Sequence, residues 1–245
     1  MEGIMNGQKT TAFLNDELNG RSIEEKLNYL TQNYPDKVIF TTSFGYEDQV
    51  ITDIIFGNDF SVKVATLDTG RMFEETYKVY RSTQERYGKT IKAYFPPAEK
   101  VEKLLQEKGP FSFYESLENR KECCFIRKVI PLKRVLKGNE IWITGLRASQ
   151  SDNRSEMKEF EWDEGNEIIK YNPLRNWSLE EVKDYVKKHN VPYNVLHDKG
   201  FVSIGCEPCT RAIRPGENFR AGRWWWEQNS GKECGLHESA TKNSN

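Results

Sequence analysis

The chain repeats a pattern in which a short apolar strand is followed by a loop of small residues and then by an amphipathic helix. Strands are expected at residues 37–42, 61–67, 90–95, 140–144 and 168–171. This alternation is typical of α/β domains. It predicts a twisted, mainly parallel sheet flanked by helices, and sheets of this kind bind ligands at the carboxyl ends of their strands.

Composition narrows the class of protein further. The 245 residues include 37% hydrophobic and 12% aromatic side chains, which is too much core-forming material for a disordered chain. A formal net charge of −1 argues against a dedicated nucleic-acid-binding protein, whose domain would be strongly basic. No apolar run approaches the roughly 18 residues of a membrane helix, and residues 1–13 lack the pattern of a secretory signal. We therefore expect a cytoplasmic protein without a membrane partner, in which thiols stay reduced.

Three regions are expected along the chain. Residues 1–21 form a loose N-terminal segment, residues 22–205 form the α/β domain, and residues 206–245 form an extension rich in Arg, Trp and Cys. No linker or internal repeat separates these regions. The extension is therefore expected to contribute to the site of the α/β domain and not to fold as a second domain.

Helix boundaries are marked by capping residues and by proline. Ser22 with Glu25, and Ser178 with Glu181, have the spacing of a capping box and predict two helix starts. Pro131 lies inside an expected helix, which it must kink or split. The helices are expected at residues 22–33, 50–57, 73–87, 99–108, 121–136 and from 178 onward.

Four of the five cysteines occur as two close pairs. Cys123 and Cys124 are adjacent, and Cys206 and Cys209 form a CxxC sequence. Two sulfurs from each of two segments can make a four-thiolate site, which suits zinc or an iron–sulfur cluster. Neighbouring side chains on a helix diverge by about 100°. The adjacent pair therefore favours a cluster with separated iron atoms over a single zinc ion.

Other interpretations of the cysteines stay open at this point. Cys123 and Cys124 could be buried structural thiols beside a CxxC turn, or the CxxC could be a thioredoxin-like redox pair. Cys234 lies near the end of the chain, where a thiol with a lowered pKa could act as a nucleophile. It could equally be a surface cysteine without a function.

Cations and small-residue loops point to an anionic ligand. Lys128 follows Cys124 by four residues, on the same face of the expected helix. Arginine side chains bind phosphate and sulfate oxygens well. One segment near the C-terminus contains a single acid, Glu217, and four arginines: Arg211, Arg214, Arg220 and Arg223. Three loops each follow a predicted strand: residues 43–45, 68–70 and 145–154. Loops of small residues at this place can bind an anion through backbone N–H groups. Together these three loops predict a nucleotide site.

Eight segments, taken in order, resemble the assimilatory sulfonucleotide reductases. These segments are SFGYEDQV, LDTGRMFEETY, RKECCFIRKVIPL, WITGLRASQS, VPYNVLHDKG, SIGCEPCT, GENFRAGRWWWE and KECGLH. The resemblance runs from about Val38 to His237 and implies a fold of the adenine nucleotide α-hydrolase type. It implies reduction of adenosine 5′-phosphosulfate (APS) to sulfite and AMP, with thioredoxin as the reductant, in sulfate assimilation and cysteine biosynthesis.

The same resemblance assigns roles to individual residues. The expected ligands of a 4Fe–4S cluster are Cys123, Cys124, Cys206 and Cys209. Cys234 matches the nucleophile that forms an S-sulfocysteine, and Lys128 matches a lysine between cluster and substrate. Groups around the phosphosulfate are matched by Arg220, Arg223 and His237. The loops that hold the nucleotide contain Ser43, Gly45, Thr69, Gly70, Gly145 and Arg147.

The resemblance leaves the substrate partly open. Members with the four cluster cysteines mostly use APS, whereas members without the cluster use the 3′-phosphorylated form, PAPS. All four cysteines are present here, so the resemblance favours APS, and a PAPS or dual-substrate reductase is the alternative. A homo-oligomer is also left open.

Two other functions compete with the reductase. An RNA sulfurtransferase on a related nucleotide-binding fold would need an SGGxDS-type loop and usually a basic RNA-binding domain, and SFGYED lacks the second glycine of that pattern. A zinc-binding interaction module would be colourless and would not need Cys234.

Overall fold

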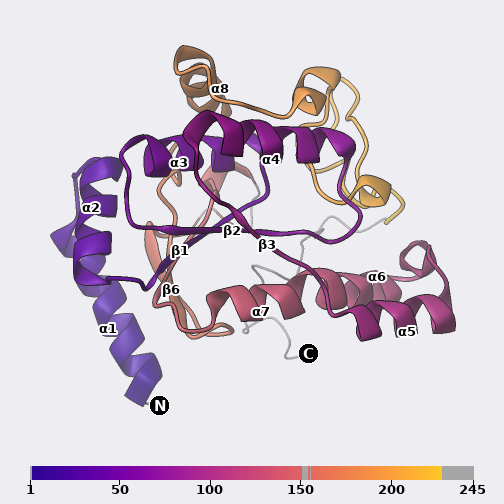
Figure 1. The fold of residues 1–245 in the computed structure, drawn as a ribbon, viewed down its shortest axis with the longest axis horizontal. Coiled ribbons are helices and arrows are strands. Elements are labelled where there is room, and N and C mark those ends of the chain that lie inside the picture. The colour runs from indigo at the N-terminus through magenta and orange to yellow at the C-terminus, as the bar shows by residue number, and fades with distance from the viewer. Residues whose placement is uncertain (1, 151–153, 155, 228–245) are drawn as a thin grey trace. The chain divides into compact units, whose positions relative to one another are not determined.

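The computed structural model describes residues 2–150, 154 and 156–227, with side chains from Gly7 onward (Figure 1). Its α-helices are α1 (Glu2–Glu17), α2 (Ile23–Asn33), α3 (Tyr46–Gly57), α4 (Glu74–Tyr87), α5 (Ala98–Lys108), α6 (Leu117–Cys124), α7 (Ile130–Leu136) and α8 (Leu179–Lys188). Short helical turns include η1 (Ser112–Tyr114), η3 (Ala148–Gln150), η5 (Val195–Lys199) and η6 (Glu207–Cys209). None of the described helices is both long enough and apolar enough to cross a bilayer.

A six-stranded sheet with the order β3-β2-β1-β4-β6-β5 is the centre of the fold. Its strands are β1 (Val38–Thr42), β2 (Lys63–Leu67), β3 (Lys92–Tyr94), β4 (Ile141–Ile143), β5 (Phe160–Asp163) and β6 (Ile168–Tyr171). β4 pairs in parallel with both β1 and β6, in the registers Val38 to Ile141 and Ile141 to Ile169. β5 pairs antiparallel with β6, with Phe160 opposite Tyr171. The expected α/β fold, a mainly parallel sheet flanked by helices, is confirmed.

Two compact units share the chain. The first contains residues 1–65, 79–92 and 136–193, and the second contains residues 66–78 and 93–135 and the chain from residue 194 onward. The chain passes between the units inside β2, α4 and β3, at the end of α7, and between Tyr193 and Asn194. Each unit has a hydrophobic core of its own.

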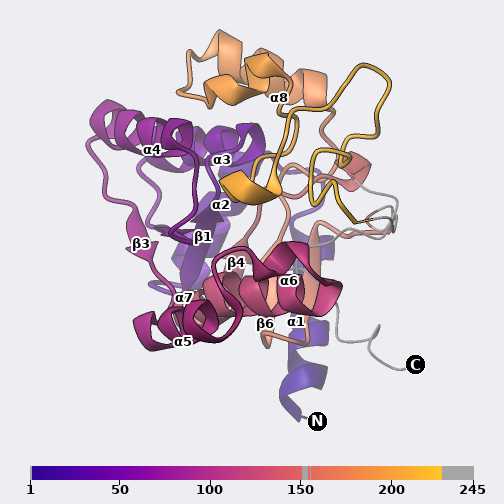
Figure 2. The same ribbon diagram turned by 90° about the vertical axis from the view of Figure 1, so that its right-hand side faces the viewer.

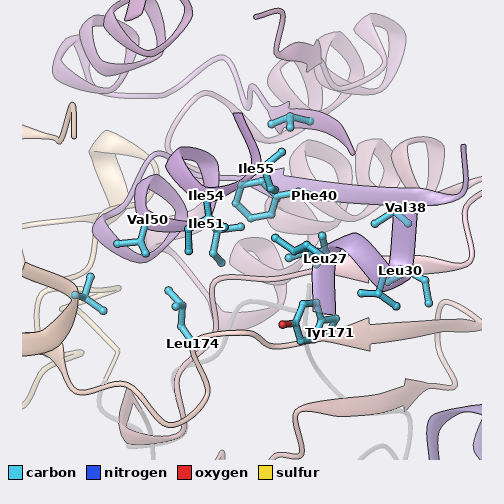
Figure 3. Packing of buried hydrophobic residues seen from close by; sticks show 14 of the residues in the cluster. Leu27, Leu30, Val38, Phe40, Val50, Ile51, Ile54, Ile55, Tyr171 and Leu174 are labelled. Atoms are coloured by element: carbon cyan, nitrogen blue, oxygen red, sulfur yellow. The ribbon is translucent and has the colours of Figure 1, made fainter. Parts of the chain in front are cut away.

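The core of the first unit follows directly from the apolar positions of its elements. Phe40 of β1 is fully buried and packs with Ile51 and Ile55 of α3 and with Leu27 of α2 (Figure 3). Burying a side chain of this size is worth roughly 1.5–3 kcal/mol. The helices begin where the capping boxes predicted, because Ser22 and Ser178 accept from the N3 backbone in α2 and α8.

The N-terminal segment differs from its prediction, because it forms the helix α1 and is not loose. Leu14 and Leu18 of α1 are buried in the core. The Asn15 side-chain amide donates to the Phe160 carbonyl at 2.8 Å and its Oδ1 accepts from the Phe160 N–H at 3.2 Å. The strand β5, which contains Phe160, is also absent from the sequence prediction. The packing partner of α1 was therefore not visible in the sequence.

The second unit is built around a helical run from α6 to α7, with α5 alongside it (Figure 2). Its core contains Leu104, Phe113, Cys123, Ile126 and Trp224, all buried. Two cysteines predicted as metal ligands, Cys123 and Cys209, belong to this core. The thiols and the aromatic residues of the C-terminal extension therefore stabilise the same unit.

The middle of this helical run is a π-helix, η2 (Phe125–Val129), where an unbroken α-helix would ordinarily continue. The Ile130 N–H donates to the Phe125 carbonyl oxygen, which is the i→i−5 bond of a π-turn. Pro131 follows directly and has no N–H to continue the α-helical ladder. The predicted distortion at Pro131 is thus present, as a wider turn just before it. π-turns of this kind are frequent at functional sites.

Candidate functional site

Four thiols from two segments of the second unit line one pocket. Cys123 and Cys124 end α6, while Cys206 precedes η6 and Cys209 ends it. Cys123 and Cys209 are buried, and Cys124 and Cys206 are half-buried. The fold therefore brings together two cysteine pairs whose nearest ends are 82 residues apart in the sequence.

Hydrogen bonds from neighbouring loops fix the CxxC turn. The Glu207 N–H donates to the Arg71 carbonyl oxygen at 2.8 Å, and the Tyr114 hydroxyl donates to the Pro208 carbonyl oxygen at 2.6 Å. The Cys209 N–H donates back to the Cys206 carbonyl at 3.0 Å. These bonds hold the turn at both ends and orient its two sulfurs into the pocket.

The loop after β2 also reaches this turn. Thr69 Oγ1 lies 3.3 Å from Cys206 Sγ, and the Gly70 N–H donates to Asp68 Oδ1 at 2.8 Å. The Tyr77 hydroxyl also donates to the Asp68 carboxylate, at 3.0 Å. Thr69 and Gly70, predicted to hold the nucleotide, are thus part of a loop that is in direct contact with one of the four thiols.

Cations surround the thiols on the pocket wall. The lining includes Arg71, Arg120, Arg127 and Lys128. Arg127 is buried and donates from Nη1 to the Thr69 carbonyl oxygen at 2.7 Å. The Arg71 guanidinium lies 5.1 Å from the centre of the Phe113 ring. The pocket is therefore a positively charged one and suits a negatively charged group.

Burial and charge act in opposite directions on the thiols. Burial raises the pKa of the Cys209 thiol to about 12, helped by the nearby Cys206, while Lys128 and Arg223 oppose the rise. Burial likewise raises the pKa of Cys123, and Arg127 opposes this. These thiols would be protonated unless further positive charge entered the pocket. A bound metal supplies such charge and deprotonates its thiol ligands.

The donor chemistry fits a soft metal or an iron–sulfur cluster. Four sulfurs in one pocket are the ligand set that both zinc and iron–sulfur sites use. Among the described residues, no three His, Cys, Asp or Glu side chains are grouped as ligands of a single metal ion.

The arginine-rich segment after the CxxC folds back on itself. Thr210 and Arg223 form an antiparallel bridge, and the Trp224 N–H donates to the Cys209 carbonyl at 3.2 Å. Around the buried Trp224 ring lie the guanidinium groups of Arg120 at 4.5 Å, Arg223 at 4.7 Å and Arg220 at 5.9 Å. Trp224 therefore packs the two predicted phosphosulfate-binding arginines beside the thiol pocket by cation–π contacts.

In the first unit, the loop between β1 and α3 is organised by a buried carboxylate. Asp48 Oδ2 accepts from the Ser43 N–H and from the Ser43 hydroxyl, both at 2.6 Å. Burial nevertheless raises the pKa of Asp48 to about 6, with a contribution from Glu47. Gly45 is the N-cap of α3. A Cβ on Gly145, in the loop after β4, would lie 2.0 Å from Asp48 Oδ1, so any larger residue there would displace the Asp48 carboxylate.

Arg147 is held by side chains of its own loop and of α3. Its Nε donates to Glu47 Oε1 at 2.8 Å and its Nη1 donates to Ser149 Oγ at 2.6 Å, and the residue is only 2% exposed. Gln150 Nε2 donates to the same Glu47 oxygen at 2.9 Å. Within the first unit, Arg147 thus joins the loop after β4 to the start of α3.

The predicted site residues fall into three groups. The first unit holds Ser43, Gly45, Gly145 and Arg147, and the second holds Thr69, Gly70, Lys128, Arg220, Arg223 and the four paired cysteines. Cys234 and His237 lie outside the described residues. Arg71 and Asp48 also organise these loops, and nothing in their local sequence marks them as organising residues.

Comparison with known proteins places the chain in a family. Residues 37–212 match the model of the phosphoadenosine phosphosulfate reductase domain. The adenosine 5′-phosphosulfate reductase of Agrobacterium fabrum is 44% identical over 232 residues, 95% of this chain and 89% of that protein. The adenosine 5′-phosphosulfate reductase of Sinorhizobium fredii strain NGR234 is 46% identical over 231 residues, 94% of this chain and 92% of that protein.

Solved structures agree with this assignment. A crystal structure of phosphoadenylyl-sulfate reductase from Candida auris is 32% identical with a TM-score of 0.71, over 84% of this chain and 97% of that chain. FMN adenylyltransferase from Candida glabrata, at 14% identity and a TM-score of 0.52 over 97% of this chain and 84% of that chain, shares the fold alone. The chain therefore belongs to the phosphoadenosine phosphosulfate reductase family.

Proposed function

We propose that the protein is an adenosine 5′-phosphosulfate reductase, which converts APS to sulfite and AMP. The pocket lined by four thiols and four cations carries this proposal. The names of relatives that are about 45% identical over most of the chain support it. In the sequence, the same order of motifs ends in KECGLH, which contains the remaining cysteine, Cys234.

Cys123, Cys124, Cys206 and Cys209 would hold a 4Fe–4S cluster. Support comes from their common pocket and from the divergence of the two adjacent thiols, which suits separated iron atoms better than one zinc ion. When bound, such a cluster would supply a compact charged group that fixes the two cysteine segments and attracts Lys128.

Cys234 would begin the reaction as a thiolate. Its sulfur attacks the sulfate sulfur of APS, the new S–S bond forms, and the bond between that sulfur and the bridging oxygen breaks. AMP leaves with the bridging oxygen and its electron pair, and S-sulfocysteine remains on Cys234. Phosphate is a good leaving group, so the step needs charge compensation more than acid catalysis.

Thioredoxin would complete the cycle. A thiolate of its dithiol attacks the Cys234 sulfur, which forms a mixed disulfide and releases sulfite with the electron pair of the broken S–S bond. The second thioredoxin thiol then attacks the mixed disulfide and restores the Cys234 thiol. The two electrons that reduce the sulfate sulfur come from the dithiol, which leaves as a disulfide.

The remaining predicted residues would bind and orient the substrate. Lys128, Arg220 and Arg223 would offset the charge of the sulfate and phosphate groups as the S–O bond breaks. His237 would contact the phosphosulfate from the same C-terminal segment as Cys234. The nucleotide would be held by the loops that contain Ser43, Gly45, Thr69, Gly70, Gly145 and Arg147.

A PAPS or dual-substrate reductase is the second candidate. It is favoured by the description of the matching family model and by the likeness to the Candida auris phosphoadenylyl-sulfate reductase. The decisive experiment is turnover of APS and PAPS side by side, anaerobically, with thioredoxin, measuring sulfite and the adenosine nucleotide. Faster sulfite release from APS is expected, and activity with PAPS alone would contradict the proposal.

Lys128→Ala tests the role of the lysine beside the thiols. We expect a large loss of kcat with iron content and visible absorbance unchanged. Lys133→Ala, which alters an exposed cation on α7, is the matched control. Near-normal turnover of Lys128→Ala with an intact cluster would reject the assigned role.

A further inference from the structure

The segment between the CxxC and the tryptophans is a closed hairpin, which we define as residues 210–223 and call the arginine hairpin. The bridge between Thr210 and Arg223 closes its base, and the Arg211 N–H donates to the Gly222 carbonyl at 2.9 Å. A Cβ on Gly222 would lie 2.3 Å from the Arg211 carbonyl oxygen, so the two limbs approach as closely as backbones allow. The outgoing limb follows Cys209 and the return limb carries Arg220 and Arg223.

A single acid, Glu217, clamps this hairpin. Arg211 donates to both carboxylate oxygens of Glu217, from Nη1 to Oε2 at 2.7 Å and from Nη2 to Oε1 at 2.9 Å. The backbone N–H of Arg214 donates to Oε2 at 2.8 Å. Glu217 thus holds the side chain of one limb and the backbone of the tip. The tip turns through Gly216, whose φ of +84° favours glycine.

The partial exposure of the Arg211–Glu217 ion pair indicates that the pair fixes the shape of the hairpin more than it stabilises the folded protein. The Arg211 and Glu217 side chains are 34% and 29% exposed, and partly exposed ion pairs add little to global stability. A bidentate arginine–carboxylate pair does fix direction and distance. Glu217 is also the only acid among residues 210–223, and the other charged side chains of this segment are four arginines. Its charge commits Arg211 to the clamp.

We propose that Glu217 is a positioning residue for substrate binding, which holds the arginine hairpin closed so that Arg220 and Arg223 are presented together. The inference rests on the proposed function, in which these two arginines bind the phosphosulfate. If the hairpin were open, the substrate would have to order it on binding. The apparent affinity for APS would then be reduced in proportion to the fraction of protein whose hairpin is closed. Loss of the clamp therefore raises KM and leaves kcat nearly unchanged.

Glu217→Gln tests this inference, because it keeps the shape of the side chain and removes its charge. We expect KM for APS to rise roughly tenfold, equivalent to about 1.4 kcal/mol, with kcat within about twofold of wild type. Arg211→Met should give the same increase. Because the two side chains form one contact, the double variant should be no worse than either single variant. Glu164→Gln, an exposed acid in a turn of the first unit, should behave as wild type.

Limited trypsin proteolysis provides a readout that does not depend on turnover. A closed hairpin protects the bond after Arg211, so Glu217→Gln should be cut there faster than wild type and Glu164→Gln should not. An unchanged KM together with an unchanged cleavage rate would overturn the inference. A loss of kcat with loss of iron would also overturn it, because Glu217 would then be a structural residue. If wild type fails to reduce APS, the proposed function fails, and faster cleavage of Glu217→Gln would still establish the clamp.

Discussion

Arg127 donates from Nη1 to the backbone carbonyl oxygen of Thr69, with 2.7 Å between the two atoms. This bond joins the π-helix η2, just after the adjacent cysteines, to the loop whose hydroxyl lies beside Cys206. Arg127 also opposes the rise that burial causes in the pKa of the Cys123 thiol. One buried guanidinium therefore positions a backbone carbonyl and compensates thiolate charge within the same unit.

Arg127→Met should destabilise the second unit. The substitution leaves the Thr69 carbonyl without its charged donor, and hydrogen bonds to charged groups are worth about 1.5–3 kcal/mol. We expect a clearly lower melting temperature and a lower iron content after anaerobic purification. Lys133→Met on the exposed side of α7 is the control. Equal melting temperatures for the two variants would show that the bond contributes nothing.

Gly145→Ala should disrupt the loop after β1 through its effect on Asp48. The added methyl group would meet Asp48 Oδ1 at 2.0 Å, so the carboxylate that holds Ser43 must move. Overpacking of this kind costs about 1–3 kcal/mol. We expect weaker nucleotide binding by calorimetry and a lower melting temperature. Gly57→Ala is the matched control because nothing lies within 4 Å of its Cβ position, and equal behaviour of both variants would refute the account.

Asp48 should make folding stability depend on pH. Its pKa is about 6 in the folded protein against an ordinary value of 3.8, so between these values the folded state binds more protons than the unfolded state. Stability from this group is therefore fully present at low pH and falls as pH rises through 6. Two pKa units correspond to about 3 kcal/mol.

The measurement compares urea unfolding of wild type and Asp48→Asn between pH about 4 and about 7. Asparagine stays neutral, so the variant should gain stability relative to wild type as pH rises. Comparing the two proteins at each pH cancels the other carboxylates. A constant difference across this range would mean that Asp48 ionises as freely in the folded protein as in the unfolded chain.

Arg120, which is buried, and Glu227, which is half-buried, form an ion pair in the second unit, at 2.8 Å with side chains 4% and 12% exposed. Removing Arg120 leaves the half-buried Glu227 carboxylate without its partner, and the loss of one member of a fully buried pair costs at most about 3–5 kcal/mol. Arg120→Met should therefore lower the melting temperature strongly. Adding Glu227→Gln should recover part of the loss, because no unpaired charge then remains. A double variant less stable than Arg120→Met would contradict this assignment.

The sequence predicted the parallel core of the fold because its signals are local. Capping boxes at Ser22 and Ser178 and apolar runs such as Val38–Thr42 identify their elements without knowledge of the rest of the chain. The helix α1 and the strand β5 were missed because each is stabilised by the other, through bonds between Asn15 and Phe160. Tertiary contacts of this kind leave no periodic pattern in the sequence.

The candidate site likewise has features that local sequence signals predicted and features that only the folded structure shows. Adjacent cysteines and a CxxC predicted one shared pocket, and the structure brings all four thiols to it. The clamp on Arg211 by Glu217 and the restriction of Gly145 by Asp48 depend on loop geometry that only the folded chain defines. The position of Arg147 in the loop after a predicted strand, together with the family resemblance, predicted that it helps to hold the nucleotide. Its ion pair with Glu47 could be seen only in the structure.

The most direct test of the proposed mechanism is mass spectrometry of the C-terminal peptide after incubation of the protein with APS without a reductant. The account predicts an added SO3 group on Cys234, an equal amount of AMP in solution, and release of sulfite once thioredoxin is supplied. The Cys234→Ser variant should keep its iron and show neither product. Sulfite formation by wild type without any adduct on Cys234, or by the serine variant, would contradict the account.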